Sequence, residues 1–291
     1  KVNYIVEADI KGFFDHVNHD WLMIFLRLRI ADRRVQRLIW RMLKGGIMEE
    51  GLTTVHDEGT PQGGVLSPLL SNIYLHYVLD LWFERVVRSH CQGEAYYFRY
   101  ADDFLACFQY KRDALRYYQA LGPRLAKFHL EIEPRKTKLI EFGRYAGKNA
   151  RSRGQRPSQF DFLGFTFYCD KTRYGNFKVK RRTSKKKFRA KLKEEKEWLR
   201  ANRSRLKRGE ILKHARQVYI GHLQYYAITD NWDLCNQFGR EYVRLLYKWL
   251  NRQSQRRSYC WPNLNDALKW IKWPKVSIKH KIDPFRKLSL N

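Results

Sequence analysis

The first half of the chain alternates short apolar runs with segments of helical spacing. Apolar runs between turn residues predict strands at 4–10, 95–100, 104–108, 130–132, 139–142 and 160–168, and a hairpin at 47–58. Apolar positions at helical spacing predict helices at 20–26, 35–43, 67–86 and 113–127. A loop rich in glycine, arginine and serine is expected at 143–157. This irregular order predicts an α+β fold, in which a small antiparallel sheet packs on helices.

Local signals mark where several of these helices begin. Ser67 followed by Pro68 predicts a helix start, because serine caps helices and proline is favoured in the first turn. We interpret Asp15 and Asp20 as helix-start charges or caps, and Asp161 as a strand-edge residue. These three carboxylates are therefore not assigned to catalysis.

The second half of the chain has mainly helical patterns. Helices are predicted at 184–206, 211–228, 234–250 and 264–271. In the first of them, Phe188, Leu192, Leu199 and Leu206 form one apolar stripe, and basic side chains fill much of the remaining surface. The change of pattern predicts two domains: residues 1–180 contain the sheet, and residues 181–291 form an all-α basic bundle.

Charge is distributed unevenly between the two halves. The whole chain has a net charge of +29 and a pI near 10.0. Residues 1–170 contain 25 basic and 20 acidic side chains, whereas residues 171–291 contain 33 and 9. The nine acidic side chains of residues 171–291 cannot balance the 33 basic ones. A polyanionic partner is therefore expected, and nucleic acid is the first candidate. Aromatic side chains lie among the cations; most are expected in the helical core, and a few are expected to stack on unpaired bases.

Composition argues against other classes of protein. The chain has no apolar run of about 18 residues that could cross a bilayer, and its first residues do not resemble a secretion signal. The five cysteines are far apart and never form a CxxC pair, which argues against a disulfide framework or a zinc site. A cytoplasmic protein without a membrane partner is therefore expected.

Carboxylates follow two of the predicted strands. Asp9 ends the first strand, and Asp102 and Asp103 lie between the strands at 95–100 and 104–108. Aspartate in a turn is common and means little alone. Neighbouring strand ends, however, can bring three carboxylates together, and hard divalent cations are their natural partner. Two Mg²⁺ ions bound there could activate a hydroxyl and stabilise the leaving oxygen of a phosphoryl transfer.

A glycine-rich loop at 59–66 leads into a helix that contains Asn72-Ile73-Tyr74-Leu75-His76. Together with the carboxylates, these residues resemble group II intron-encoded reverse transcriptases, which are also maturases. The matching motifs are Asp9 to Asp15 for the first catalytic motif, Pro61-Gln62-Gly63 for the template and nucleotide loop, Tyr100 to Asp103 for the metal-binding hairpin, Glu133 to Lys138 for the next motif, and Phe162 to Phe165 for the primer grip. The first domain resembles the polymerase palm, and the basic half resembles the thumb or maturase domain.

The resemblance implies a role for particular residues. Asp9, Asp102 and Asp103 would be catalytic: Asp9 and Asp102 would hold two Mg²⁺ ions, with Asp103 as a weaker contributor and the Ile10 carbonyl completing a site. Phe14 would exclude the ribose 2′-hydroxyl, with core packing as the alternative. The nucleotide would contact Gln62, Gly63 and Lys136; Lys138 competes with Lys136, which could also be an ordinary loop lysine. Residues expected to bind nucleic acid are Lys185, Lys186, Lys187, Arg189, Lys193, Arg200 and Arg203. The implied partners are an RNA template, a DNA primer, dNTP and intron RNA.

More than one function fits this resemblance. The first is an RNA-directed DNA polymerase that also binds intron RNA and assists splicing and mobility. The family has a fingers region ahead of the first catalytic motif, which is not expected in the few residues before Asp9. An RNA-binding maturase without polymerase activity is therefore one alternative, and a domesticated relative in phage defence or CRISPR adaptation is another. The segment 284–291 is expected to be too short for a DNA-cleaving domain.

Overall fold

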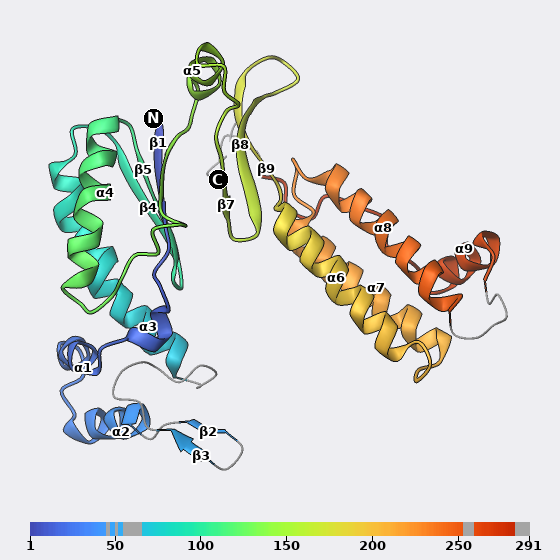
Figure 1. Cartoon of the computed structure of the whole chain (residues 1–291), viewed down its shortest axis with the longest axis horizontal. Coiled ribbons are helices and arrows are strands. Elements are labelled where there is room, and N and C mark those ends of the chain that lie inside the picture. Colours follow the sequence, from blue (N-terminus) through green and yellow to red (C-terminus); the bar gives the residue numbers. More distant parts are fainter. Residues whose placement is uncertain (45–46, 50–51, 55–65, 253–258, 283–291) are drawn as a thin grey trace, which may run out of the picture. The chain divides into compact units, whose positions relative to one another are not determined.

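Contacts within the chain divide it into two units. The computed structural model describes residues 1–44, 47–49, 52–54, 66–252 and 259–282 (Figure 1). The first unit contains Lys1–Phe160 and Lys171–Lys178, and the second contains Asp161–Asp170 and Val179–Asn291. The domain boundary expected at residue 180, and the palm and thumb assignments, stay predictions.

A four-stranded antiparallel sheet is central to the first unit. Its strands are β1 (Tyr4–Ala8), β4 (Ala95–Tyr100), β5 (Asp103–Phe108) and β6 (Lys138–Glu141), in the spatial order β4-β5-β1-β6. The strand expected at 130–132 is reduced to one bridge between Ile10 and Ile132, because the chain turns again at 134–136. The predicted α+β class and the other strands of this sheet are confirmed.

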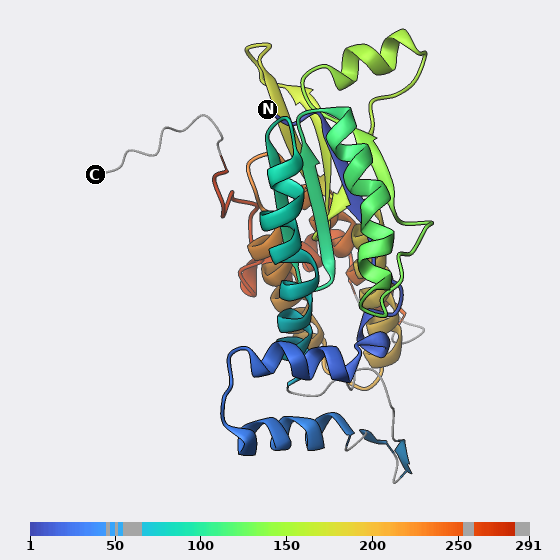
Figure 2. The same cartoon turned by 90° about the vertical axis from the view of Figure 1, so that its left-hand side faces the viewer.

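Helices cover one face of this sheet (Figure 2). They are α3 (Ser67–Leu75), its π-helical continuation η2 (His76–Asp80) and η3 (Phe83–Val87), the short η4 (Arg88–His90), and α4 (Lys111–Ala126). Phe83, Phe108 and Tyr117 are buried together, with ring centroids 5.3 to 6.1 Å apart. The helix predicted at 67–86 is confirmed in extent, but Leu66 is its cap and Ser67 its first residue.

Shorter elements link β1 to α3. They are η1 (Phe13–His16), α1 (His19–Arg27), α2 (Arg33–Lys44), β2 (Ile47–Glu49) and β3 (Leu52–Thr54). The cap of α1 is Asn18, whose Oδ1 accepts a hydrogen bond from the Trp21 amide at 3.0 Å. Asp20 therefore contributes charge to the first turn of α1, and Asp15 does the same in η1.

A second sheet contains β7 (Gln159–Phe162), β8 (Phe165–Lys171) and β9 (Phe177–Thr183) in that order. The pair at 160–168 is confirmed, but β9 was not predicted, because its alternating cations hide the strand pattern. The loop expected at 143–157 also contains a helix, α5 (Ala146–Ser152). Ala146 and Ala150 are its buried residues, and two small side chains are too weak a signal for prediction.

Four helices make up most of the second unit. They are α6 (Lys185–Asn202), α7 (Arg208–Tyr226), α8 (Trp232–Leu250) and α9 (Trp261–Trp270), all close to their predicted ranges. Their shared core includes Leu199, Tyr219, Phe238 and Leu264. A buried carboxylate, Glu195, accepts a hydrogen bond from the Tyr242 hydroxyl at 2.6 Å and pairs with Lys191 at 3.0 Å. None of the described helices is long and apolar enough to cross a membrane.

Candidate functional site

The turn between β4 and β5 contains Asp102. Tyr100 pairs with Asp103, so Ala101 and Asp102 alone form the turn. Ala101 has a left-handed φ of 53°, which is uncommon for a residue with a side chain but suits a two-residue hairpin. Backbone strain of this kind is concentrated at functional sites. Asp102 therefore lies at the tip of the hairpin, whereas Asp103 is the first residue of β5.

Asp9 reaches the same place from β1. Ala8 lies opposite Phe104, so the end of β1 is next to the beginning of its antiparallel neighbour β5. As a result, Asp9 and Asp102 line one pocket of about 270 Å³. The other lining residues are Ile10, Lys11, Gly12, Phe13, Phe14, Glu133 and Lys136. Asp103, the first residue of β5, is exposed and outside this lining.

A cationic side chain already contacts Asp9. Lys136 Nζ donates a hydrogen bond to Asp9 Oδ2 at 2.5 Å. This hydrogen bond raises the pKa of the Lys136 ammonium, and the charge of Asp103 acts in the same direction. Lys136 is two-thirds exposed, so water screens the attraction and the side chain can move away at little cost.

The donor set suits a hard divalent cation. Asp9 and Asp102 provide carboxylate oxygens, and Asp9 binds the ammonium of Lys136 in the structure. The two hydrogen bonds of the bridge to Ile132 involve the Asp9 carbonyl and the Lys11 amide, and neither involves the Ile10 carbonyl. Within the described residues, however, no group of three His, Cys, Asp or Glu side chains is placed to hold a metal. The structure thus brings together two of the three expected carboxylates.

An arginine before the turn fixes the hairpin to the neighbouring helix. Arg99 Nε and Nη2 donate to the two carboxylate oxygens of Asp80 at 2.7 and 2.6 Å. Its Nη1 donates to Asn72 Oδ1 at 2.8 Å and to the Ala101 carbonyl at 3.0 Å. Burial disfavours the charged guanidinium, but the bonds to Asp80 outweigh this and raise the pKa of Arg99. One side chain therefore connects α3, η2 and the strained turn.

Sequence reasoning missed this network. Asn72, His76 and Asp80 are four residues apart, which places them on one helical face. His76 Nδ1 also lies 3.3 Å from Asp80 Oδ2. The spacing was a usable signal, but nothing in the sequence indicates that this face meets Arg99.

Of the residues expected to contact the nucleotide, the structure describes Phe14 but not Gln62 or Gly63. Phe14 lies in η1 and lines the pocket beside Asp9, with its ring centroid 5.3 Å from that of Phe13. The turn into η1 uses Gly12 at a φ of 51°, where a Cβ atom would lie 3.1 Å from the His16 ring. Gln62 and Gly63 lie outside the described residues.

Comparison with known proteins identifies the family. A family model described as reverse transcriptase (RNA-dependent DNA polymerase) matches residues 1–167, more than half of the chain, and this range contains Asp9 and Asp102. The chain belongs to the reverse transcriptase family. Protein YkfC of Escherichia coli K12 is 31% identical over 204 residues, which cover 60% of this chain and 50% of YkfC. The chain therefore spans about half the length of that relative.

A second relative confirms the resemblance to group II intron proteins. Group II intron-encoded protein LtrA of Lactococcus lactis is 48% identical over 82 residues, which cover 27% of this chain and 14% of LtrA. Among solved structures, apo telomerase of Candida tropicalis matches 93% of this chain and 45% of its own chain, with a TM-score of 0.48 and 14% identity. That structural likeness is too weak to support an argument about function.

The basic helix α6 contains most of the residues that are expected to bind nucleic acid. Lys185, Lys186, Lys187, Arg189, Lys193 and Arg200 are exposed. Among the described residues, Lys185 to Lys187, Arg189 and Arg200 form no ion pair, whereas Lys193 lies 3.8 Å from Glu197. Arg203 differs, because its guanidinium lies over the Trp249 ring at 5.0 Å and is only partly exposed.

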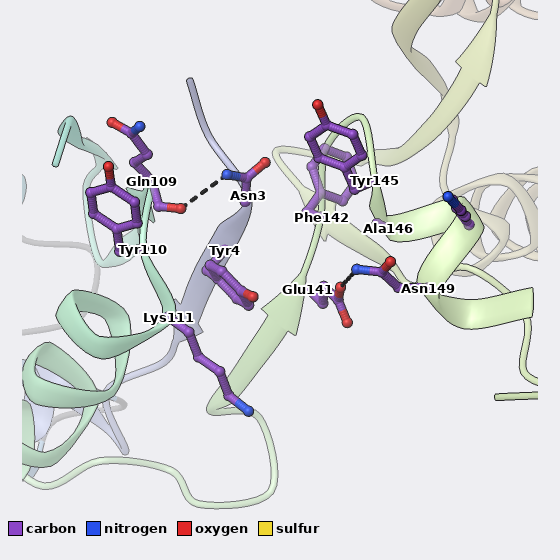
Figure 3. A pocket seen from close by; sticks show the side chains of 11 residues that line it. Asn3, Tyr4, Gln109, Tyr110, Lys111, Glu141, Phe142, Tyr145, Ala146 and Asn149 are labelled. Carbon is purple, nitrogen blue, oxygen red and sulfur yellow. Dashed lines mark hydrogen bonds between the residues drawn. The ribbon is translucent and has the colours of Figure 1, made fainter. Parts of the chain in front are cut away.

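A second pocket of the first unit lies at the other end of β1. It has a volume of about 400 Å³, and Figure 3 shows Tyr4, Tyr110 and Glu141 among its lining residues. Asn149 and Arg153 donate to the Glu141 carboxylate at 2.5 and 2.6 Å, and these bonds lower its pKa. Because β1 separates this pocket from Asp9 by roughly 17 Å at 3.3 Å per residue, it is not part of the carboxylate site.

Proposed function

We propose that this chain catalyses RNA-templated DNA synthesis, adding a nucleotide from dNTP to the 3′-hydroxyl of a DNA primer. One observation carries the proposal: Asp9 and Asp102 line the same pocket in a member of the reverse transcriptase family. The strained Ala101 turn and the Arg99 network support it, because both hold Asp102 in a fixed position.

The residues that line the carboxylate pocket would have different roles in this reaction. Asp9, Asp102 and the Ile10 carbonyl would hold Mg²⁺, and Asp103 would contribute charge from outside the pocket. Bound Mg²⁺ supplies activation of the attacking hydroxyl and neutralisation of the leaving pyrophosphate. Lys136 would leave Asp9 and place its ammonium near the pyrophosphate, where it can neutralise charge or donate a proton.

Phe14 would select deoxyribonucleotides, because its ring lines the pocket in which the sugar would lie. The Phe14→Val variant is expected to incorporate ribonucleotides about 10- to 100-fold more efficiently relative to deoxyribonucleotides. The ratio of kcat/KM values for rNTP and dNTP measures this effect. Phe25→Val is the matched control, since Phe25 is buried in the same core and does not line the pocket; an equal change of the ratio in both variants would favour the core-packing alternative for Phe14.

The basic helix would bind RNA, and the similarity to LtrA, an intron-encoded protein, supports intron RNA as the ligand and assistance to splicing as the outcome. Replacing Lys185, Lys186 and Lys187 with glutamine is expected to lower the slope of log affinity against log salt by up to about three. Lys269→Gln is the control, because Lys269 is paired with Asp266 at 3.0 Å. A slope that the triple variant leaves unchanged removes α6 from the RNA interface.

A primer-extension assay tests the proposed function. The wild-type chain is incubated with a labelled DNA primer on an RNA template, with dNTP and Mg²⁺, and extended primer is expected. An RNA-binding protein without polymerase activity would bind the same template and leave the primer unchanged, so that result would reject the polymerase proposal and favour the RNA-binding alternative.

A further inference from the structure

The second unit contains a pocket that none of the catalytic motifs explains. Its volume is about 630 Å³, and it lies between α8, α9 and the segment that follows α9. Residues that line it include three tryptophans, three cations and two asparagines: Trp232, Trp261, Trp273, Arg240, Arg244, Lys275, Asn236 and Asn265. Tyr219 and Gly239 close its inner side, where a Cβ atom placed on Gly239 would clash with the Tyr219 hydroxyl.

Helical spacing arranges these side chains. Trp232, Asn236, Arg240 and Arg244 follow one another at intervals of four residues along one face of α8. On α9, Trp261 and Asn265 have the same spacing. The walls of the pocket that α8 and α9 form therefore contain aromatic, amide and cationic groups together.

Several polar groups of this pocket have no polar partner among the residues that the structure describes. Among the described residues, Arg240, Arg244 and Lys275 form no ion pair. The Nδ2 atom of Asn236 is shielded from solvent and has no hydrogen-bond partner there. An amide donor left in this state costs free energy unless a ligand or water satisfies it. Trp232 is 49% exposed, and Trp261 is 43% exposed, with its ring stacked on that of Tyr247 at a centroid distance of 4.1 Å.

We propose that this pocket binds an unpaired nucleobase of RNA together with its flanking phosphates. Indole rings offer flat apolar faces on which a base can stack, asparagine amides can bond to a base edge, and arginine and lysine match phosphate. The proposal rests on the proposed function as an RNA-binding reverse transcriptase. It adds a second point of contact, specific for single-stranded RNA, to the phosphate-binding surface of α6.

A peptide or a duplex fits the pocket less well. Trp261 stacks on Tyr247 and Trp273 on Tyr219. Carboxylates of an acidic peptide would satisfy the cations but would leave the half-exposed ring of Trp232 without a flat partner. In a duplex the bases are stacked on one another and cannot enter. An unpaired nucleotide supplies the ring, the polar edge and the anion at once.

Binding of three RNAs to the full chain tests this proposal. The probes are a fluorescein-labelled uridine octamer, an abasic octamer with the same ribose-phosphate backbone, and a blunt RNA duplex. The Trp232→Ala variant is expected to bind the uridine octamer about 5- to 100-fold more weakly, which is the loss from one base–aromatic stack. Its affinity for the abasic octamer and for the duplex is expected to equal that of the wild type, and Trp232→Tyr is expected to restore binding.

Two further variants keep the test decisive. Trp270→Ala is the matched control, because Trp270 lies on α9, is 72% exposed and does not line the pocket. Arg240→Gln removes an exposed charge and leaves the core unchanged. It is expected to lower the slope of log affinity against log salt for the uridine octamer by about one. Equal losses in Trp232→Ala and Trp270→Ala, or equal losses for the uridine and abasic octamers, would overturn the proposal.

The outcome separates this pocket from the polymerase. Base-dependent binding by a wild-type chain that cannot extend a primer supports the pocket and rejects the proposed catalysis. Primer extension without base-dependent binding rejects the pocket and leaves the catalysis supported. A wild-type chain that binds none of the three RNAs rejects both.

Discussion

The Asp102→Asn variant is expected to incorporate nucleotides about 10³-fold more slowly than the wild type, or slower still. Asparagine has the size of aspartate and fits the same turn, but it removes the negative charge that would hold a divalent cation. The rate of single-nucleotide incorporation, measured with a preformed complex of protein, primer and RNA template, reports this effect. Affinity for the primer and template is expected to stay unchanged, because their phosphates bind to cationic side chains elsewhere.

The control for this variant is Asp20→Asn. Asp20 is exposed in the first turn of α1 and outside the carboxylate pocket, so its replacement is expected to leave the rate within about twofold of the wild type while costing a few tenths of a kcal/mol in helix stability. An Asp102→Asn chain that keeps the wild-type rate would show that Asp102 takes no part in the reaction.

Replacing Arg99 with lysine is expected to lower kcat about 10- to 100-fold, although Arg99 does not line the carboxylate pocket. Lysine retains the charge but lacks the planar fork that bonds Asp80, Asn72 and the Ala101 carbonyl together. The turn that holds Asp102 would lose a contact that opposes its backbone strain. Because a misplacement of about 1 Å at a reacting centre can cost a hundredfold in rate, Arg99 acts as a positioning residue.

Steady-state kinetics distinguish this role from a general loss of stability. A positioning defect lowers kcat and leaves the KM for primer and template unchanged, at a temperature at which the variant is fully folded. Arg88→Lys is the matched control. Arg88 of η4 pairs with Glu84 of η3 at 2.8 Å, and both side chains are more than half exposed. An Arg99→Lys variant with wild-type kcat, or one whose rate falls only in proportion to its unfolded fraction, would contradict the positioning role.

The pattern of apolar runs in the sequence predicted that Asp9 and Asp102 lie close together. Asp9 ends an apolar run, and Asp102 separates two more, so antiparallel pairing of those runs brings the two residues to one edge of the sheet. The same logic could not separate Asp102 from Asp103. That difference depends on which residue begins β5, and strand ends are the least certain part of a sequence-based prediction.

Contacts between distant side chains could not be predicted. The bond from Lys136 to Asp9 and the four bonds of Arg99 join segments whose separation in space follows from tertiary packing rather than local pattern. The tryptophan pocket of the second unit is a similar case. The sequence indicates aromatic residues among cations, and helical spacing places Trp232 and Arg240 on one face of α8. That this face forms a pocket depends on the packing of α9 against it, which the sequence does not predict. Strand β9 was missed because its cations mask the apolar alternation.

A double-mutant cycle tests most directly whether Asp9 and Asp102 act as one site. The rate of single-nucleotide incorporation on an RNA template is measured for the wild type, Asp9→Asn, Asp102→Asn and the double variant. If both carboxylates serve the same cations, either single change removes the function, and the double variant is expected to be no slower than the slower single variant. Losses that multiply in the double variant, or a single variant that remains fully active, would contradict the shared site.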